Sequence, residues 1–215
     1  MSTRVDRVLA DIRACRICEA HLPLGPRPVV QAAASSRILI VSQAPGRKVH
    51  ETGIPFNDPS GRRLRQWMGV DDAMFYDPGK VAIVPMGFCF PGTGKGGDLP
   101  PRPECAPTWH PRLLPLLTRV QLTLVIGMYA HKGMLDERRR RTLTDTVAHW
   151  RDFIDDGLLP LPHPSPRNQM WFRRNPWFEA ELVPDLQRRV AVALNRQMRR
   201  STQERSPAGA GLRGA

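Results

Sequence analysis

Four short runs of apolar residues recur along the chain, separated by segments in which apolar residues return with helical spacing. The runs are Ile38–Val41, Val81–Val84, Leu122–Ile126 and Leu158–Leu161. Continuous apolar strands that alternate with helices indicate a parallel sheet covered on both faces. The pattern therefore predicts an α/β protein, a three-layer α/β/α fold around a central four-stranded parallel sheet. Such folds carry their chemistry in the loops at the carboxyl ends of the strands.

The helical segments are predicted from the same periodicity. Apolar residues from Val5 to Ile12 recur every three or four positions and predict an amphipathic helix over about residues 3–17. This helix is expected to carry Cys15 and Cys18 at its C-terminal end.

Three later helices are also expected. Ser60 is expected to be the N-cap of a helix that continues through Trp67. A basic helical stretch containing Arg138–Arg141 follows the third apolar run; a solvated helix face is its ordinary explanation, and no function is assigned to it. The last helical segment, from about residue 175 to 195, is expected to be interrupted or kinked near Pro184.

The length of 215 residues fits one domain. We assign residues 1–199 to this domain and expect residues 200–215, which have almost no large apolar side chains, to form a disordered basic tail. No stretch approaches the ~20 apolar residues of a membrane helix, and the N-terminus lacks the apolar segment of a secretory signal. These features predict a soluble, cytoplasmic protein, expected to be a monomer.

The formal net charge is +12, and arginine supplies nearly all of the positive charge. Arginine binds phosphate in bidentate geometry, so a polyanionic partner such as DNA is favoured. The alternative explanation is a GC-rich genome, which encodes arginine readily. Charge alone does not decide between them.

Four cysteines form a spaced set: Cys15 and Cys18 in a CxxC pair, then Cys89 and Cys105. In a reducing cytoplasm such a set is more typical of metal ligands than of disulfides. Four thiolates suit either a tetrahedral zinc ion or a 4Fe-4S cluster, and spacing alone does not separate these two. The remaining alternative is four unrelated thiols.

Two polar motifs follow the first and the last apolar run. The first is Ser42-Gln43-Ala44-Pro45-Gly46, and the second is His163-Pro164-Ser165-Pro166. Together with the four cysteines, in this order, they closely resemble the motifs of the uracil-DNA glycosylase superfamily, and in particular its iron–sulfur family 4. The resemblance covers about residues 10–195 and favours iron over zinc.

The resemblance implies an activity and a role for each matched position. A DNA glycosylase hydrolyses the N-glycosidic bond of a base, here uracil, that is flipped out of DNA, and thereby starts base excision repair. His163 is then expected to donate a hydrogen bond to the leaving base, and Ser165 to bind a DNA phosphate. Phe56 is expected to stack on the flipped base, with a core position as the alternative. Arg167 is the candidate for the side chain that fills the gap left by that base.

Two positions depart from the family pattern. Several families of relatives carry a water-activating Asp or Asn at the position of Ala44, and family 4 has alanine there with a Glu before it. The preceding residue here is Gln43, which cannot act as a base. Gln43 is expected to hold a water in place, and Glu51 is the preferred carboxylate for orienting it, with an exposed loop position as the alternative. The second departure is Pro85, where relatives read the uracil edge with an asparagine.

Asn57 is the candidate that replaces this asparagine, so Ala44, Phe56 and Asn57 make up the expected substrate-binding set. Other deaminated bases, such as hypoxanthine or xanthine, remain alternative substrates. Neither motif contains a lysine that would form a Schiff base with the sugar, which predicts a monofunctional enzyme. The residues from 92 to 102 contain no histidine, unlike the branch of the superfamily that traps its product covalently.

Competing functions come from other classes. A protein that binds damaged or single-stranded DNA without cutting it is favoured by the missing base at Gln43 and Ala44. A redox iron–sulfur protein is the third possibility.

Overall fold

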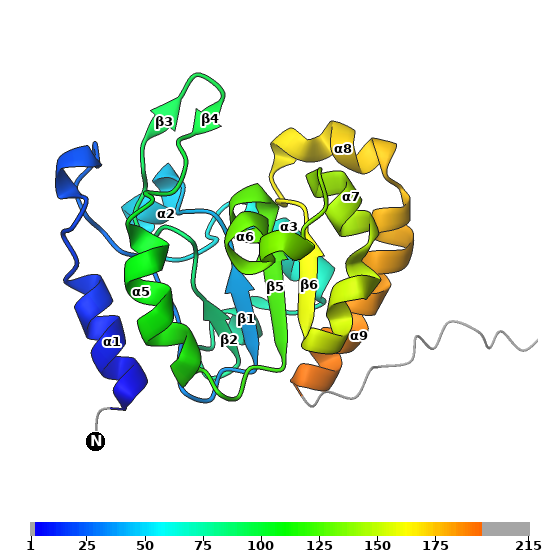
Figure 1. Ribbon diagram of the computed structural model, residues 1–215, viewed down its shortest axis with the longest axis horizontal. Helices are drawn as coiled ribbons and strands as arrows, with labels where there is room; N and C mark the ends of the chain where they lie inside the picture. Colours follow the sequence, from blue (N-terminus) through cyan, green and yellow to red (C-terminus); the bar gives the residue numbers. More distant parts are fainter. Residues whose placement is uncertain (1–2, 195–215) are drawn as a thin grey trace, which may run out of the picture.

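The computed structural model describes residues 3–194, and a four-stranded parallel sheet forms its centre (Figure 1). The strands are β1 (Ile38–Val41), β2 (Val81–Ile83), β5 (Leu122–Ile126) and β6 (Leu158–Leu161). Their order across the sheet is β2-β1-β5-β6, and every adjacent pair is parallel. The predicted four-stranded parallel sheet is confirmed.

The positions of the strands in the sheet account for the residue types that they contain. Ile40 of β1 pairs with Ile83 on one side and with Leu124 on the other, so the central strand is apolar throughout. Pro160 lies in β6, the outermost strand on its side. Proline lacks an amide hydrogen and is accommodated at a sheet edge, where that hydrogen has no strand to pair with.

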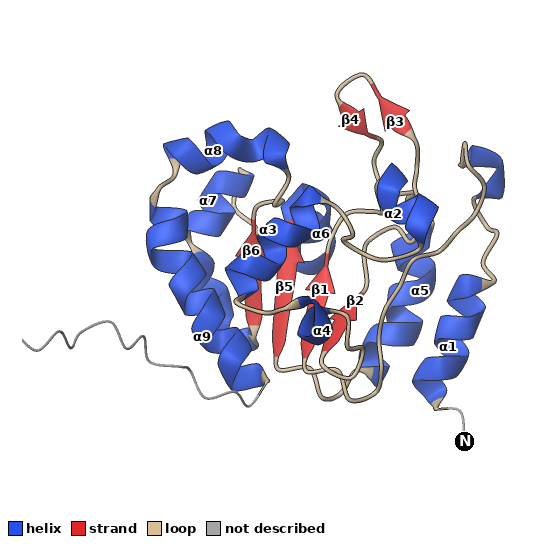
Figure 2. Ribbon diagram, turned by 180° about the vertical axis from the view of Figure 1, so that it is seen from behind, coloured by secondary structure: helices blue, strands red, loops and turns tan. Residues whose placement is uncertain are grey.

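Helices cover both faces of the sheet, as the three-layer prediction requires (Figures 1 and 2). One face packs against α1 (Arg4–Arg13), α5 (Cys105–Leu113) and α6 (Gly127–Met134). The other packs against α3 (Pro59–Met68), α8 (Gln169–Arg174), a π-helical turn (Phe178–Leu182) and α9 (Val183–Ala193). Alternate residues of β1 enter the two cores, with Ile38 and Ile40 on the α3 side and Leu39 and Val41 on the α1 side.

Shorter elements connect these layers. They are α2 (Arg47–Thr52), α4 (Asp72–Phe75), α7 (Leu143–Ala148), the hairpin strands β3 (Thr93–Gly94) and β4 (Gly97–Asp98), and 3-10 turns at Glu19–His21, Leu114–Leu116, Asp136–Arg138, Trp150–Asp156 and Pro166–Asn168. The hairpin was not predicted. It projects from the end of the molecule where the parallel strands finish (Figure 1).

Two helix predictions need correction. The first helix begins at a capping box formed by Thr3 and Asp6 and ends at Arg13, so Cys15 and Cys18 follow it instead of lying on it. Ser60 is not the N-cap of α3.

The N-cap of α3 is Asp58, whose carboxylate accepts the Gly61 N–H at 2.8 Å. Pro59 occupies the first helical position, which suits a residue without an amide hydrogen. Ser60 is therefore already inside the first turn, where it is buried.

The two later helical segments also differ in part from the prediction. Helix α6 ends at Met134 and a 3-10 turn covers Asp136–Arg138, so the predicted helical stretch is present up to that turn and wrong at Arg139–Arg141, which are not helical. The expected interruption near Pro184 is present as the π-helical turn, and Pro184 itself lies in the first turn of α9. The predicted tail at 200–215 lies outside the described residues. Within residues 3–194, no helix combines the length and the apolar character needed to cross a bilayer.

Candidate active site

A cavity of about 600 Å³ opens at the carboxyl end of the sheet. Its walls come from the loops after β1, β2 and β6, from the start of α3 and from the hairpin. Among the lining residues are Ser42, Gln43, Ala44, Phe56, Asp58, Pro85, Asp98, His163, Ser165, Arg167 and Asn168. Both sequence motifs thus meet in one cavity.

His163 is held in one orientation by its own loop. Its Nδ1 atom accepts the backbone N–H of Ser165 at 3.2 Å, and its carbonyl accepts a hydrogen bond from Asn168 Nδ2 at 2.8 Å. Arg63 of α3 donates to the Ser165 carbonyl at 3.4 Å and ties the loop to the helix. Because Nδ1 is an acceptor, the ring proton of neutral His163 lies on Nε2, and no described residue makes a hydrogen bond to that atom.

The charge state of His163 follows from its surroundings. Burial lowers the pKa of His163, and the negative charge of Asp58 offsets part of this effect. His163 is therefore neutral at neutral pH and presents an N–H donor to the cavity. Such a donor can stabilise negative charge that develops on a bound group.

The loop after β1 extends the sheet into the cavity. Met86 N–H donates to the Ser42 carbonyl and Gly87 N–H to the Gln43 carbonyl, each at 2.9 Å, so the two loops run side by side beyond the strands. The Gln43 amide packs over Gly127, where a Cβ atom would lie 2.7 Å from Gln43 Nε2. Gln43 is thus confined by the start of α6 as well as by its own backbone.

Phe56 has an unusual backbone conformation. Its φ is 54°, in the left-handed region that non-glycine residues seldom occupy. Gly61 approaches so closely that a Cβ there would overlap the Phe56 carbonyl, and Arg65 donates to the same carbonyl at 3.4 Å. The ring lines the cavity and also packs edge-on against Phe75 with centroids 6.1 Å apart. Phe56 therefore lines the cavity and contributes to the core at once.

Ser165 and Arg167 lie at the rim. The Ser165 hydroxyl accepts the Arg167 N–H at 3.3 Å and caps the 3-10 turn that follows. The Arg167 side chain donates to the Gly96 carbonyl at 3.3 Å, so it reaches across the cavity mouth to the hairpin. This contact joins two walls that are far apart in sequence.

The model of the uracil DNA glycosylase superfamily matches residues 29–187 of the chain. The match includes both motif loops and more than half of the sequence. The chain belongs to the uracil-DNA glycosylase superfamily. Membership supports DNA glycosylase activity and DNA as the partner.

Two residues that were expected in the glycosylase site are not among those that line the cavity. Glu51 lies on α2 with an exposed side chain, and its carbonyl accepts a hydrogen bond from Arg27. Val49 and His50 are the residues of that turn that face inward. Asn57 is partly buried beside Phe56 but is also absent from the lining.

Asp58 was missed by the sequence interpretation. It lines the glycosylase cavity together with His163 and begins α3. The dipeptide Asp58-Pro59 is a typical helix start, with an N-cap followed by proline, and would have located this carboxylate.

A second histidine positions the wall of the cavity at Pro85. His110 is buried in α5, and its Nε2 lies 3.0 Å from the Pro85 carbonyl. Pro85 lines the cavity but offers no side-chain hydrogen bond to a base.

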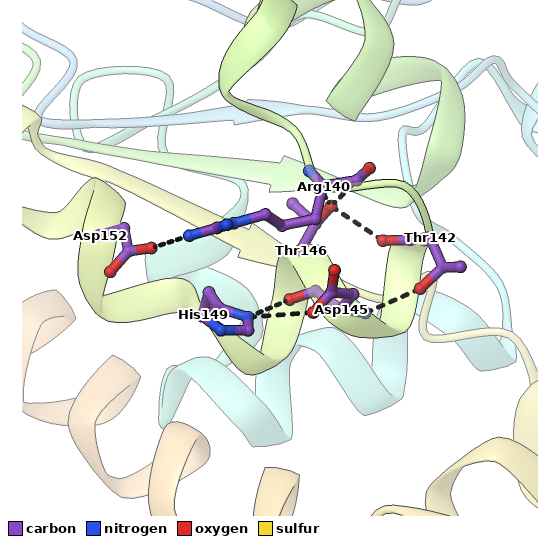
Figure 3. Close-up of polar contacts among 6 residues, drawn as sticks. All are labelled: Arg140, Thr142, Asp145, Thr146, His149 and Asp152. Atoms are coloured by element: carbon purple, nitrogen blue, oxygen red, sulfur yellow. Dashed lines mark hydrogen bonds and ion pairs between the residues drawn. The ribbon is translucent and has the colours of Figure 1, made fainter.

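Two arginines of the loop between α6 and α7 pair with acidic neighbours. Arg138 pairs with Asp156 at 2.6 Å and Arg140 with Asp152 at 2.9 Å. Figure 3 shows Arg140 extended towards Asp152, next to the turn where Thr142 caps α7. None of these residues lines the glycosylase cavity.

Two of the four cysteines, Cys15 and Cys105, pack against the core on the α1 side. All four are free thiols; Cys18 is buried and the other three are partly buried. Burial raises the pKa of Cys89 to about 11 and that of Cys105 to about 12, and the charges of neighbouring cysteines add to both shifts. The charges of Cys15 and Cys18 raise the pKa of both Cys89 and Cys105, so the four cysteines are close enough to interact electrostatically.

Within residues 3–194, no group of three or more His, Cys, Asp or Glu side chains is close enough to hold one metal ion. Two of the thiols have backbone donors: Phe88 N–H donates to Cys105 Sγ at 3.3 Å, and Arg27 N–H donates to Cys89. Backbone N–H groups directed at sulfur are typical of thiolates that bind iron–sulfur clusters.

Proposed function

We propose that the protein is a monofunctional DNA glycosylase that hydrolyses the N-glycosidic bond of uracil flipped out of DNA. The observation that carries this proposal is the free Nε2–H of neutral His163 in the cavity that Phe56 also lines. One wall offers an aromatic face for stacking, and the other offers a donor for an anionic oxygen. A planar base with a carbonyl fits between them.

The chemistry follows from these groups. When the bond between the sugar and the base breaks, its electron pair leaves with the base and positive charge develops on the sugar. A hydrogen bond from Nε2 to the base carbonyl grows stronger as the base becomes anionic, so it stabilises the transition state more than the ground state. No lysine is among the described residues that line the cavity, which supports direct hydrolysis without a Schiff base.

Uracil is the favoured substrate within this proposal, although Pro85 and Asn57 do not supply the side-chain amide that relatives use. The backbone N–H groups of Met86 and Gly87 are already bound to the loop after β1, so the match to the uracil DNA glycosylase superfamily is what supports uracil. Hypoxanthine and xanthine also carry a carbonyl that His163 could bind. They are the competing substrates.

The decisive experiment is an excision assay on oligonucleotides that contain uracil, hypoxanthine, xanthine or a mismatched thymine, as single strands and as duplexes. Alkali then cleaves the abasic sites that form. We expect the fastest strand cleavage with uracil. Tight binding without any cleavage would instead support a non-catalytic protein that binds damaged DNA, the alternative favoured by the absence of a base at Gln43.

We further propose that Cys15, Cys18, Cys89 and Cys105 hold a 4Fe-4S cluster of the family 4 type. A four-iron cluster spans more space than one ion does, so its thiolates need not approach each other as closely as zinc ligands. The backbone donors to Cys89 and Cys105 also suit thiolate ligands. Such a cluster would join the segment after α1 to the start of α5.

The cluster proposal is tested on the protein purified without oxygen. We expect four irons per chain and a brown solution with absorbance near 400 nm. A colourless protein that contains one zinc ion would show that the four cysteines bind zinc instead of a cluster. A reversible potential with no dependence on DNA would favour the redox function.

A further inference from the structure

The geometry points to Asp58 as the carboxylate that orients the attacking water and accepts its proton. This inference rests on the proposed glycosylase activity and supplies the group that Gln43 and Glu51 leave missing. It assigns a catalytic role to a residue outside both sequence motifs.

Asp58 is fixed at the edge of the cavity by its place at the start of α3. One carboxylate oxygen, Oδ1, accepts the Gly61 N–H at 2.8 Å. No hydrogen bond from the described residues reaches the other oxygen, Oδ2. The side chain is partly exposed and lines the same cavity as His163. One oxygen therefore anchors the group, and the other is available to a water.

Asp58 and His163 line the same cavity and lie within electrostatic range of each other. The Asp58 charge is the group that opposes the effect of burial on the pKa of His163. A donor for the base and an acceptor for a water thus face one space. The reaction requires these two functions on opposite sides of the bond that breaks.

Other carboxylates fit the role less well. Glu51 is exposed on α2 and does not line the cavity. Asp98 does line it, but it is exposed on the hairpin, where its Oδ2 would lie 3.2 Å from a Cβ at Gly46. Only Asp58 combines a lining position with an anchor at the start of a long helix, among the residues that the structure describes.

The step balances with Asp58 as the acceptor. The bond between C1′ of the sugar and the base nitrogen breaks, and its electron pair leaves with the base, which His163 stabilises. The water oxygen forms the new bond to C1′, and one water proton passes to Oδ2 and then to solvent. The released base takes up a proton from solvent. The products are the free base and the abasic sugar.

The cap function of Asp58 determines the best substitution. Asparagine is as good an N-cap as aspartate, so Asp58→Asn keeps the hydrogen bond to Gly61 and removes the charge and the proton acceptor. Asp71 provides a matched control, because it caps α4 through Met74 N–H at 2.8 Å and does not line the cavity. Asp71→Asn makes the same chemical change at a purely structural cap.

The experiment compares single-turnover excision rates and DNA affinity in the full chain. Asp58→Asn should slow excision of the preferred base by about 100-fold or more, the usual contribution of general-base catalysis. The affinity of Asp58→Asn for the same DNA and its melting temperature should match those of wild type. The control Asp71→Asn should match wild type in rate, affinity and melting temperature. Asp58→Ser retains a capping hydroxyl and leaves space, so added formate should partly restore its rate.

The outcomes separate the two proposals. If wild type releases a base and Asp58→Asn releases it equally fast, the inference about Asp58 is overturned while the glycosylase assignment stands. A loss of affinity that matches the loss of rate would also overturn it, because Asp58 would then bind DNA. If wild type releases no base at all, both proposals fail together.

Discussion

Two histidines at the carboxyl edge of the sheet have the same protonation pattern and opposite roles. His131 of α6 places Nε2 3.0 Å from the Val125 carbonyl and 3.1 Å from the Leu161 carbonyl, so its ring proton is shared between the ends of β5 and β6. His163 has its proton on the same nitrogen, but that nitrogen makes no hydrogen bond to a described residue. A histidine whose N–H is bound to the sheet is structural, and one whose N–H remains free is available for chemistry.

The largest effect is expected at the free histidine. His163→Ala should reduce the single-turnover excision rate by about 100- to 1000-fold, the usual result of removing one donor to a developing anion. The free energy of unfolding should change by about 1 kcal/mol or less, since only the hydrogen bond from Ser165 N–H is lost. Rate assays and urea denaturation measure the two quantities. A rate that stays within an order of magnitude of wild type would remove His163 from the proposed mechanism.

Replacing His131, whose N–H is bound to the sheet, should reduce stability and leave the excision rate nearly unchanged. His131→Ala leaves two strand carbonyls without their donor and opens a buried space, which should lower the free energy of unfolding by about 2–3 kcal/mol. At a temperature where the variant is folded, its excision rate should remain close to that of wild type. Urea denaturation followed by circular dichroism gives the stability. A slow but stable variant would mean that His131 serves catalysis and that the comparison is wrong.

The pH dependence of stability sharpens the same comparison. Burial lowers the pKa of His131 from 6.5 to about 4 in the folded protein. Below pH 6.5 the unfolded chain binds the proton and the folded chain does not, so this contribution is complete above pH 6.5 and is lost as the pH falls towards 4. From pH 7 to pH 5, His131 should account for a loss of about 2 kcal/mol in the free energy of unfolding.

The control for this prediction is His131→Gln, which keeps a donor and does not titrate. Its stability should fall less steeply with pH than that of wild type. The decline that remains should come from His50, His110 and His163, because burial lowers the pKa of each of them as well. Parallel curves for wild type and His131→Gln would show that His131 is not the titrating group.

The sheet and the motif loops could be predicted from sequence because each depends on local pattern. A buried parallel strand needs a continuous apolar run, and the loop after it must lie at the carboxyl edge. The hairpin was missed because strands of two residues in a glycine-rich segment leave no alternating pattern. Glu51 was chosen for its closeness in sequence to the first motif. Successive residues of a helix point in different directions, and α2 buries His50 and exposes Glu51.

Other features depend on contacts between distant segments. Phe56 is held at positive φ by the close approach of Gly61 and by the guanidinium of Arg65, and no local pattern indicates that arrangement. The availability of Nε2 on His163 likewise depends on where Ser165 N–H lies in the folded loop. Sequence patterns locate such residues, but their chemistry is determined by which of their atoms the fold has already used.

The smallest predicted effect is on DNA affinity and concerns Arg167 at the rim of the cavity. Here the contribution of the positive charge can be separated from that of the hydrogen bond. Arg167→Ala removes one positive charge and the hydrogen bond to the Gly96 carbonyl, while Arg139→Ala removes the same charge from an exposed position outside the cavity. Both variants should lose a similar share of the salt-dependent attraction to DNA. Arg167→Ala should lose about three- to tenfold more affinity for uracil-containing DNA, because it also loses the hydrogen bond that holds the side chain across the cavity mouth. Fluorescence anisotropy at two salt concentrations measures this, and equal losses would mean that Arg167 contributes only its charge.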